Sequence, residues 1–288
     1  MTKQEQELLE FSFDFEALSA CPLCNGKVMI PNGRIRWLEI DFWYVICPDC
    51  GLKFLNPRPT IESYRDFYRD FFWQQKIRNI GFIQPGQIWQ GKRYQWDNEE
   101  KWDPEFGRKN ISEKLKAMRI KIITNALKNN IDLGDKAQIL EVGTGFPVTL
   151  KHLKDNFGSQ VYAIEPSDEA RTVIKQDKEI KLIGRYAEEL EQLSQGDQKF
   201  DAIIFSHSLE NTVDPFSVIK FASDCLKRKG IIYVQTPHLL TFDQMNPYHP
   251  YIFCENTLRL IAEKSGLEYK QISETKDKML TAVFLKNK

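Results

Sequence analysis

From residue 138 onward, short apolar runs alternate with longer amphipathic stretches, and this alternation constrains the fold more than any other feature of the chain. The pattern is typical of βαβ units, in which parallel strands are buried between layers of helices. Two further strand-like runs close the sequence, and so few residues separate them that they should pair antiparallel. The expected strands are 138–142, 160–164, 181–183, 202–205, 231–235, 267–272 and 279–285. The pattern therefore predicts an α/β domain around a mostly parallel sheet.

The first of these strands ends in a glycine turn that leads into a helix, in the stretch "ILEVGTGFPVTLKHL". Gly143 and Gly145 allow a tight turn and let a ligand approach the backbone closely. In open α/β sheets, ligands bind at the carboxyl ends of the strands, where this turn lies. Glu165 ends the next strand, 20 residues after Gly145, and an acid there accepts hydrogen bonds from ribose hydroxyls. The stretch therefore indicates a nucleotide-type cofactor site.

The residues around this turn distinguish two cofactors, S-adenosylmethionine and NAD. Glu141 precedes the turn, and a carboxylate there suits a cationic amino-acid group better than a pyrophosphate. A dinucleotide motif would place its third glycine at position 148, which is Val148. The paired terminal strands also suit a methyltransferase sheet, which carries one reversed strand. The residues favour S-adenosylmethionine, and an NAD-dependent oxidoreductase stays open as an alternative.

Four cysteines near the N-terminus form two Cys-Pro-x-Cys turns, Cys21/Cys24 and Cys47/Cys50. Each turn points two thiolates at one ion, so two turns complete a tetrahedral zinc site. The 22 residues between the pairs contain a predicted hairpin, with strands at 27–30 and 35–46 and a turn at 31–33. This spacing predicts a zinc ribbon. Its Zn²⁺ should be structural, since four protein thiolates leave no open coordination position for chemistry.

The charge balance argues against electrostatic attraction to nucleic acid or to anionic lipid, because 40 basic residues meet 40 acidic ones. No apolar run approaches the length that spans a bilayer, and the first residues are polar and acidic, unlike a signal peptide. We therefore expect a cytoplasmic protein with reduced cysteines. Its expected partner is a small-molecule acceptor, with neither nucleic acid nor membrane involved, and the sequence leaves the oligomeric state undefined.

Several of these stretches, in this order, resemble class I S-adenosylmethionine-dependent methyltransferases. The matching segments are "LEVGTGFPVTLKHL", "VYAIEPSDEAR", "FDAIIFSHSLENTVDPFSVIKFASDCLKRKGIIYVQTPH" and "HPYIFCENTLRLIAEKSGLE". A further segment, "CPDCGLKFLNPRPTIESYRDFY", resembles the N-terminal zinc-binding segment of one group in that family, which includes sugar C-methyltransferases. The resemblance implies a Rossmann-like seven-stranded sheet, mostly parallel with one reversed strand. It also implies methyl transfer to a small molecule, such as a nucleotide-linked sugar or a precursor of a glycan or secondary metabolite.

The resemblance assigns individual residues to the cofactor. They are Glu141, Gly143 and Gly145 at the methionine part, Glu165 at the ribose diol, Pro166 and Ala187 at the adenine, and Ser206 beneath the methyl group. Two positions depart from the family pattern. Pro147 replaces the third glycine of Gly-x-Gly-x-Gly, and proline is tolerated there because the first turn of a helix needs no N–H partner. Tyr186 replaces an often acidic residue, so a non-catalytic cofactor-binding protein of the same fold stays open as a second alternative.

Methyl transfer to oxygen or carbon usually needs a base, and histidine is suited to that task at neutral pH. His207 and His238 each follow a strand at its carboxyl end, where the acceptor should lie, and His249 belongs to the next loop. We expect the base among these three, with a purely structural role open for each. His152 should lie at the surface, and Glu210 is interpreted as a residue of a turn or helix start.

Three regions are expected along the chain: a zinc ribbon (1–60), a helical and aromatic cap and connector (61–130), and a Rossmann-like cofactor-binding domain (131–288). The connector should hold one helix capped by Thr60 and a second helix over 112–129. Between them, residues 72–107 contain four tryptophans with poor periodicity. We interpret this segment either as a lid over the substrate or as a packed insertion.

Overall fold

The computed structural model describes residues 11–37, 40–70, 113–242, 249–273 and 279–287, together with four short strands in the connector. These are β6 (Ile88–Trp89), β7 (Lys92–Arg93), β8 (Trp102–Asp103) and β9 (Gly107–Arg108), which pair antiparallel as β6–β7 and β8–β9. Apart from these strands, the interpretation of residues 72–107 as a lid or insertion lies outside the described residues. Within the described residues, no helix is long and apolar enough to cross a membrane.

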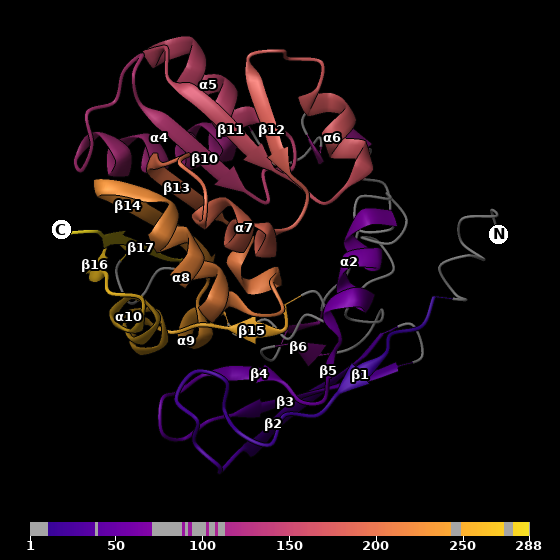
Figure 1. Ribbon diagram of the computed structural model, residues 1–288. Helices are drawn as coiled ribbons and strands as arrows, with labels where there is room; N and C mark the ends of the chain where they lie inside the picture. The colour runs from indigo at the N-terminus through magenta and orange to yellow at the C-terminus, as the bar shows by residue number, and fades with distance from the viewer. Residues whose placement is uncertain are drawn as a thin grey trace.

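A seven-stranded sheet forms the centre of the molecule, in the order β12-β11-β10-β13-β14-β17-β16 (Figure 1). All strands run parallel except β17, which pairs antiparallel with both of its neighbours. The strands are β10 (Gln138–Val142), β11 (Gln160–Ile164), β12 (Ile180–Gly184), β13 (Phe200–Ser206), β14 (Leu226–Pro237), β16 (Glu268–Gln271) and β17 (Met279–Leu285). The predicted Rossmann-like sheet with one reversed strand is confirmed.

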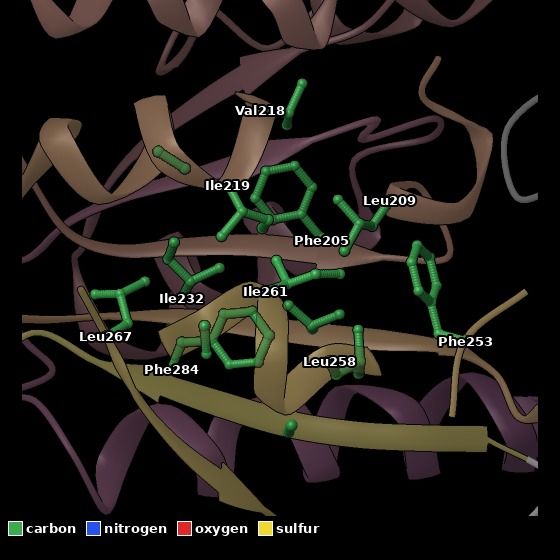
Figure 2. Close-up of a cluster of buried hydrophobic side chains, with 14 of the residues drawn as sticks. Phe205, Leu209, Val218, Ile219, Ile232, Phe253, Leu258, Ile261, Leu267 and Phe284 are labelled. Carbon is green, nitrogen blue, oxygen red and sulfur yellow. The ribbon is translucent and has the colours of Figure 1, made fainter. Parts of the chain in front are cut away.

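The inner strands β10, β11 and β13 are mostly apolar because both faces of the sheet are covered by helices. Alternate residues of β13 enter different clusters, since Ile204 packs with α4 (Glu113–Lys128) and α5 (Val148–Phe157) on one face. Ile203 and Phe205 pack on the other face, against α8 (Pro215–Cys225) and α10 (Glu255–Lys264). Figure 2 shows this second cluster, where Phe205, Ile219 and Ile261 converge. The shorter elements are α6 (Asp168–Ile174), η1 (Ala187–Glu189), α7 (Leu190–Ser194), η2 (Leu209–Asn211) and α9 (Leu239–Phe242).

The N-terminal region forms an antiparallel sheet in the order β15-β4-β3-β2, beside a two-stranded pair of β1 (Phe15–Glu16) and β5 (Arg58–Pro59). Its strands are β2 (Ile30–Trp37), β3 (Ile40–Ile46), β4 (Lys53–Leu55) and β15 (Tyr251–Ile252). The predicted hairpin turn at residues 31–33 is wrong. Those residues lie within β2, where the register shifts between Pro31 and Gly33, and Gly33 takes a φ of 128°. A bulge in the strand therefore accommodates residues whose composition is typical of a turn.

This N-terminal sheet shares its core with the helical layer of the central sheet. The fourth strand, β15, comes from the loop that follows β14, so the two regions are joined by strand pairing as well as by packing (Figure 1). Helix α2 (Ile61–Asp70) follows β5, and the Thr60 hydroxyl accepts the backbone N–H of Ser63 at 3.4 Å, as predicted for its cap. One continuous cluster contains Cys21, Cys47, Cys50, Leu52 and Phe54 from the ribbon with Tyr251, Phe253 and Leu258 from the later chain.

Candidate functional site

The glycine turn lies at the carboxyl end of β10. Gly143 and Gly145 both take positive φ angles, 71° and 57°, a region that favours glycine. The backbone N–H of Gly143 donates to the carbonyl of Ile164 at 2.8 Å, which ties the turn to the end of β11. A Cβ atom at position 143 would lie only 2.5 Å from the Cβ of Ser208. The turn therefore requires glycine both for its conformation and for its contact with the loop after β13.

Glu165 lies directly against this turn. Its Oε2 accepts the N–H of Gly145 at 2.7 Å, its Oε1 accepts the N–H of Ser167 at 2.9 Å, and its side chain is buried. Ser167 in turn caps α6 through a 3.5 Å bond from the N–H of Ala170. The structure thus brings the two predicted cofactor elements, Gly145 and Glu165, into contact.

Glu141 is the most perturbed acid of the site. It is only 3% exposed, and its Oε2 makes no hydrogen bond within the described part of the protein. Burial raises the pKa of Glu141 to about 8, helped by Glu165 and opposed by the nearby guanidinium of Arg119. A buried carboxylate with one unsatisfied oxygen is suited to receive a cationic donor, which would supply both the hydrogen bond and the charge.

Arg119, on α4, is a residue of this site that sequence reasoning missed. Its Nε donates to the Ser206 hydroxyl at 2.9 Å, and its Nη2 donates to the Ser206 carbonyl at 2.8 Å. Ser206 ends β13, so the guanidinium is fixed over the carboxyl edge of the sheet beside Glu141. In the sequence Arg119 is one of several basic residues on an amphipathic helix, and no local motif distinguishes it.

The remaining predicted cofactor residues frame the turn. Pro147 immediately precedes α5 and its carbonyl accepts the N–H of Lys151 at 2.9 Å, so proline stands at the cap of this helix. The Pro166 carbonyl accepts a hydrogen bond from Nη1 of Arg185 at 2.8 Å. Ala187 begins η1, while the preceding Tyr186 lies under the guanidinium of Arg65 at 4.9 Å.

On the other side of the glycine turn, His207 follows β13 with a φ of 58°. Its backbone N–H donates to the Gln235 carbonyl at 2.8 Å and its carbonyl accepts Nδ2 of Asn211 at 3.1 Å, so the strained backbone is fixed from both sides. The imidazole is 33% exposed, and its Nδ1 lies 3.6 Å from Oε1 of Glu210. His207 thus presents a partly open ring at the carboxyl edge of the sheet.

His249 reaches the same place from a distant part of the chain. Its carbonyl accepts the hydroxyl of Tyr44, on β3, at 2.9 Å, directly before β15 pairs with β4. Burial lowers the pKa of His249 to about 4, with Glu210 acting to raise it and His207 to lower it. His207, Glu210 and His249 therefore lie close enough to influence one another electrostatically.

The other two histidines are placed differently. His238 is 1% exposed, and its Nε2 lies 2.9 Å from Oε2 of Glu255, the first residue of α10. This pairing gives His238 a structural partner. His152 lies on α5, half-buried, with its Nδ1 3.2 Å from Nδ2 of Asn156 on the next turn of the same helix.

The four predicted zinc ligands converge. The sulfur atoms of Cys21, Cys24, Cys47 and Cys50 all lie within 4.8 Å of one another, with 3.6 Å between Cys21 and Cys50 and 3.4 Å between Cys24 and Cys47. Tetrahedral thiolates at the usual Zn–S length sit about 3.8 Å apart, so the cluster fits one zinc ion. The hydrogen bond between the two thiols lowers the pKa of Cys21 and raises that of Cys50, so the first proton of this pair leaves from Cys21.

The two cysteine turns have the same backbone geometry. In each, the N–H of the residue after the second cysteine donates to the first cysteine's carbonyl at 2.8 Å, from Asn25 to Cys21 and from Gly51 to Cys47. Both donors have positive φ angles, 64° and 81°. At Gly26, a Cβ would approach the Asp49 carboxylate to 2.3 Å, so the turns also pack closely on each other. This repeated turn is the local signal that made the site predictable.

Comparison with known proteins places this geometry in context. A family model described as "Methyltransferase domain" matches residues 111–272, more than half of the chain. A putative sarcosine dimethylglycine methyltransferase from Galdieria sulphuraria is similar in structure, with a TM-score of 0.51 at 13% identity, covering 60% of this chain and 87% of that one. The YcgJ protein from Bacillus subtilis matches with a TM-score of 0.50 at 13% identity, over 60% of this chain and 99% of its own. These two likenesses show the shared fold. No curated protein matches the sequence.

Proposed function

Because this chain belongs to the methyltransferase domain family, as a class I S-adenosylmethionine-dependent methyltransferase, we propose that it methylates a small molecule from the cofactor site at Glu141, Gly145 and Glu165. The observation that carries this proposal is the contact between Gly145 and Glu165 beside the buried, unsatisfied oxygen of Glu141. This arrangement offers an acid for ribose hydroxyls and an acid for an amino group around one glycine turn. Bound S-adenosylmethionine would supply an electrophilic methyl group.

We assign the cofactor contacts to one set of residues, which we call the cofactor half. Glu141 receives the amino group, and the guanidinium of Arg119 receives the carboxylate of the methionine part. Glu165 receives the ribose diol. The set consists of Arg119, Glu141, Gly143, Gly145, Glu165, Pro166, Ala187 and Ser206. The buried, mostly apolar strand ends around it keep water from these charges, which strengthens each contact.

We call His207, Glu210 and His249 the acceptor half, and propose that His207 is the base that takes the acceptor's proton. Its ring is partly open at the strand end, whereas His238 is buried against Glu255. Burial keeps His249 neutral at physiological pH, so it can accept a hydrogen bond from the acceptor. The acceptor class that the sequence resemblance suggests is a nucleotide-linked sugar or a precursor of a glycan or secondary metabolite.

We further propose that Zn²⁺ in the four-cysteine site is structural and that the protein works in the cytoplasm, where its thiols stay reduced. The described cysteines are all free of disulfides, including Cys225 and Cys254 outside the cluster. Elemental analysis of the purified protein should find about one zinc per chain. A zinc-free, fully folded protein would contradict this part of the proposal.

Calorimetric titration with S-adenosylhomocysteine tests the function directly. We expect binding in the micromolar range and a loss of roughly 10–100-fold in affinity for Glu165→Ala, because charged hydrogen bonds to the ribose disappear. Glu191→Ala is the matched control, since Glu191 is an exposed residue of α7 and should leave the affinity unchanged. The absence of binding by the wild-type protein would reject the proposal, and binding of NADH instead would favour an oxidoreductase. Assays against sugar nucleotides would separate an enzyme from a non-catalytic binding protein.

A further inference from the structure

Glu210 is a buried acid that has no hydrogen-bond partner in the described part of the chain. It lies in η2 after β13 and is only 1% exposed, yet neither carboxylate oxygen makes a hydrogen bond within the described residues. Its neighbour Leu209 is fully buried in the core, which anchors the short turn. Burying an acid without hydrogen bonds costs free energy, so its burial calls for a compensating contact. The sequence-based interpretation of Glu210 as an ordinary turn residue does not account for this burial.

The carboxylate faces the histidines of the acceptor half. Its Oε1 lies 3.6 Å from Nδ1 of His207, a distance slightly too long for a hydrogen bond and short enough to become one after a small shift. The backbone of His207 is held on either side by Gln235 and Asn211, which fixes the point from which the ring projects. The Nδ1 edge of the imidazole therefore points toward Glu210, and its opposite edge, with Nε2, points away from that acid.

We propose that Glu210 is a positioning residue that holds His207 in the tautomer protonated at Nδ1, leaving Nε2 to take the proton of the acceptor. This inference rests on the proposed function. In the step, the acceptor's O–H or C–H proton moves to Nε2 while a bond forms from that oxygen or carbon to the methyl carbon. The S–CH₃ bond breaks, its electron pair stays on sulfur, and the sulfonium becomes a neutral thioether. Glu210 stabilises the imidazolium that forms, as an acid behind a catalytic histidine does in other enzymes.

Among the described residues, Glu210 is the acid that lies within 4.0 Å of a His207 ring nitrogen, and other charged or titratable groups surround the pair. Helix α4 contributes Arg119, bound to the adjacent Ser206, and the loop before β15 contributes His249. The Arg58 guanidinium, on β5, binds the Val213 carbonyl and ion-pairs with Glu16. A shared metal ion is disfavoured, because within the described residues only the cysteine cluster brings three or more possible ligand atoms close enough.

Nitrogen NMR of the full-length, zinc-loaded protein labelled with ¹⁵N-histidine tests this inference without an acceptor. At a pH where the ring is neutral, Nδ1 of His207 should give a protonated, pyrrole-type resonance and Nε2 a pyridine-type resonance. His207→Gln assigns the signals by their loss. In Glu210→Gln, the side-chain amide can either accept from Nδ1–H or donate to a bare Nδ1, so the preference for the Nδ1 proton should weaken and both nitrogen resonances should shift toward averaged values. Glu210→Asp keeps the carboxylate and should keep the wild-type pattern.

The matched control is Glu255→Gln, which alters the other histidine–glutamate pair, at His238, and should leave the His207 signals unchanged. Affinity for S-adenosylhomocysteine should stay within about twofold in both glutamine variants, since neither residue belongs to the cofactor half. A wild-type His207 protonated at Nε2 would overturn the inference even if Glu210→Gln failed to fold, and so would an unchanged tautomer in a folded Glu210→Gln. Failure of the wild-type protein to bind S-adenosylhomocysteine would instead reject the proposed function.

Discussion

In the cofactor half, Gly145 and Glu165 lie 20 residues apart and are joined directly by a hydrogen bond, whereas in the acceptor half Tyr44 holds His249, 205 residues later. The centre of the first half, with Glu141, Gly145 and Glu165, is built from two consecutive strands and the turns that follow them, and Arg119 joins it from α4 through Ser206. The second is assembled from β13, from η2 and from a strand that the N-terminal sheet holds in place. The centre of the cofactor half is therefore local in the chain, whereas the acceptor half depends on long-range assembly.

The largest expected effect on stability comes from Cys50→Ser, which should disturb the acceptor half through the N-terminal sheet. Loss of one thiolate should empty the zinc site and release the pairing of β4 with β15. The loss of a structural metal removes several kcal/mol, so the melting temperature should fall on the order of 10 °C. Differential scanning calorimetry and zinc analysis measure both changes.

Cys254→Ser provides the control for this change, because Cys254 is close to Gly51 but outside the four-cysteine cluster. It should keep its zinc and its melting temperature. At room temperature, folded Cys50→Ser should still bind S-adenosylhomocysteine within a few-fold of the wild-type affinity. A complete loss of cofactor binding would show that the two halves are not separable.

Gly143→Ala is the opposite test, because it changes the cofactor half and leaves the zinc cluster intact. The new Cβ would meet Ser208 at 2.5 Å in a backbone with a φ of 71°, so strain and overpacking together should cost about 2–4 kcal/mol of unfolding free energy. S-adenosylhomocysteine affinity should fall, while the zinc content should not change. Denaturant unfolding and calorimetry measure the two effects.

Two other glycines separate the cost of the positive φ angle from the cost of the steric contact with Ser208. Gly266 has a φ of 71°, and a Cβ there would have no neighbouring atom within 4 Å, so Gly266→Ala should show the backbone cost alone, about 1 kcal/mol. Gly134 has open space and no positive φ, so Gly134→Ala should be neutral or slightly stabilising. Equal losses in all three variants would contradict the close contact between the glycine turn and Ser208.

Glu141 gives the cofactor half a pH dependence. Because its pKa is about 8 when folded, against about 4.3 in an unfolded chain, the folded protein holds a proton that the unfolded chain releases. This contribution to stability is complete below about pH 4 and is lost as the pH rises to about 8. A bound cationic amino group should favour the ionised form of Glu141 over the protonated form. Binding should therefore release about one proton near pH 7.

Calorimetry of S-adenosylhomocysteine binding in two buffers with different ionisation enthalpies counts that proton. Affinity should also rise as the pH increases toward about 8, the pKa of Glu141. Glu141→Gln carries no titrating group and should abolish both effects. Buffer-independent enthalpies in the wild-type protein would mean that Glu141 does not meet the cofactor's charge.

The smallest expected effect on stability is at the contact between α2 of the N-terminal region and the turn before η1, next to the cofactor half. Arg65 stacks on Tyr186 at 4.9 Å and lies 3.7 Å from Glu188. These contacts are partly exposed, so Tyr186→Ala should cost only about 0.5–1 kcal/mol of unfolding free energy. A double-mutant cycle with Arg65→Ala isolates the pair. A coupling above about 2 kcal/mol would reveal a stronger connection between the two regions than the geometry supports.

Features that depend on local sequence were predictable, and features that depend on long-range contacts were not. The central sheet and the glycine turn were predictable because buried strands, Gly143, Gly145 and Glu165 form short patterns that each carry a physical cause. The bulge in β2 was missed because Pro31–Gly33 is also the composition of a turn, and only tertiary pairing decides between them.

Arg119 and β15 were missed for a related reason. Arg119 acquires its role from Ser206, 87 residues later, and β15 is a two-residue strand defined by its partner rather than by its own composition. From the sequence, Glu210 could be interpreted only as a polar residue of a turn. Its burial follows from the packing of η2. A single sequence contains no local trace of such contacts.

The pairing of β4 with β15 also sets an order of events during synthesis. All four cysteines leave the ribosome well before Tyr251, which supplies the last strand of their sheet. At ordinary elongation rates, roughly 10–40 s pass between the two. During that interval the nascent chain presents an edge strand that nothing of its own yet covers, so chaperone protection or early zinc capture is most valuable there. The ribbon is therefore made well before the strand that completes its sheet.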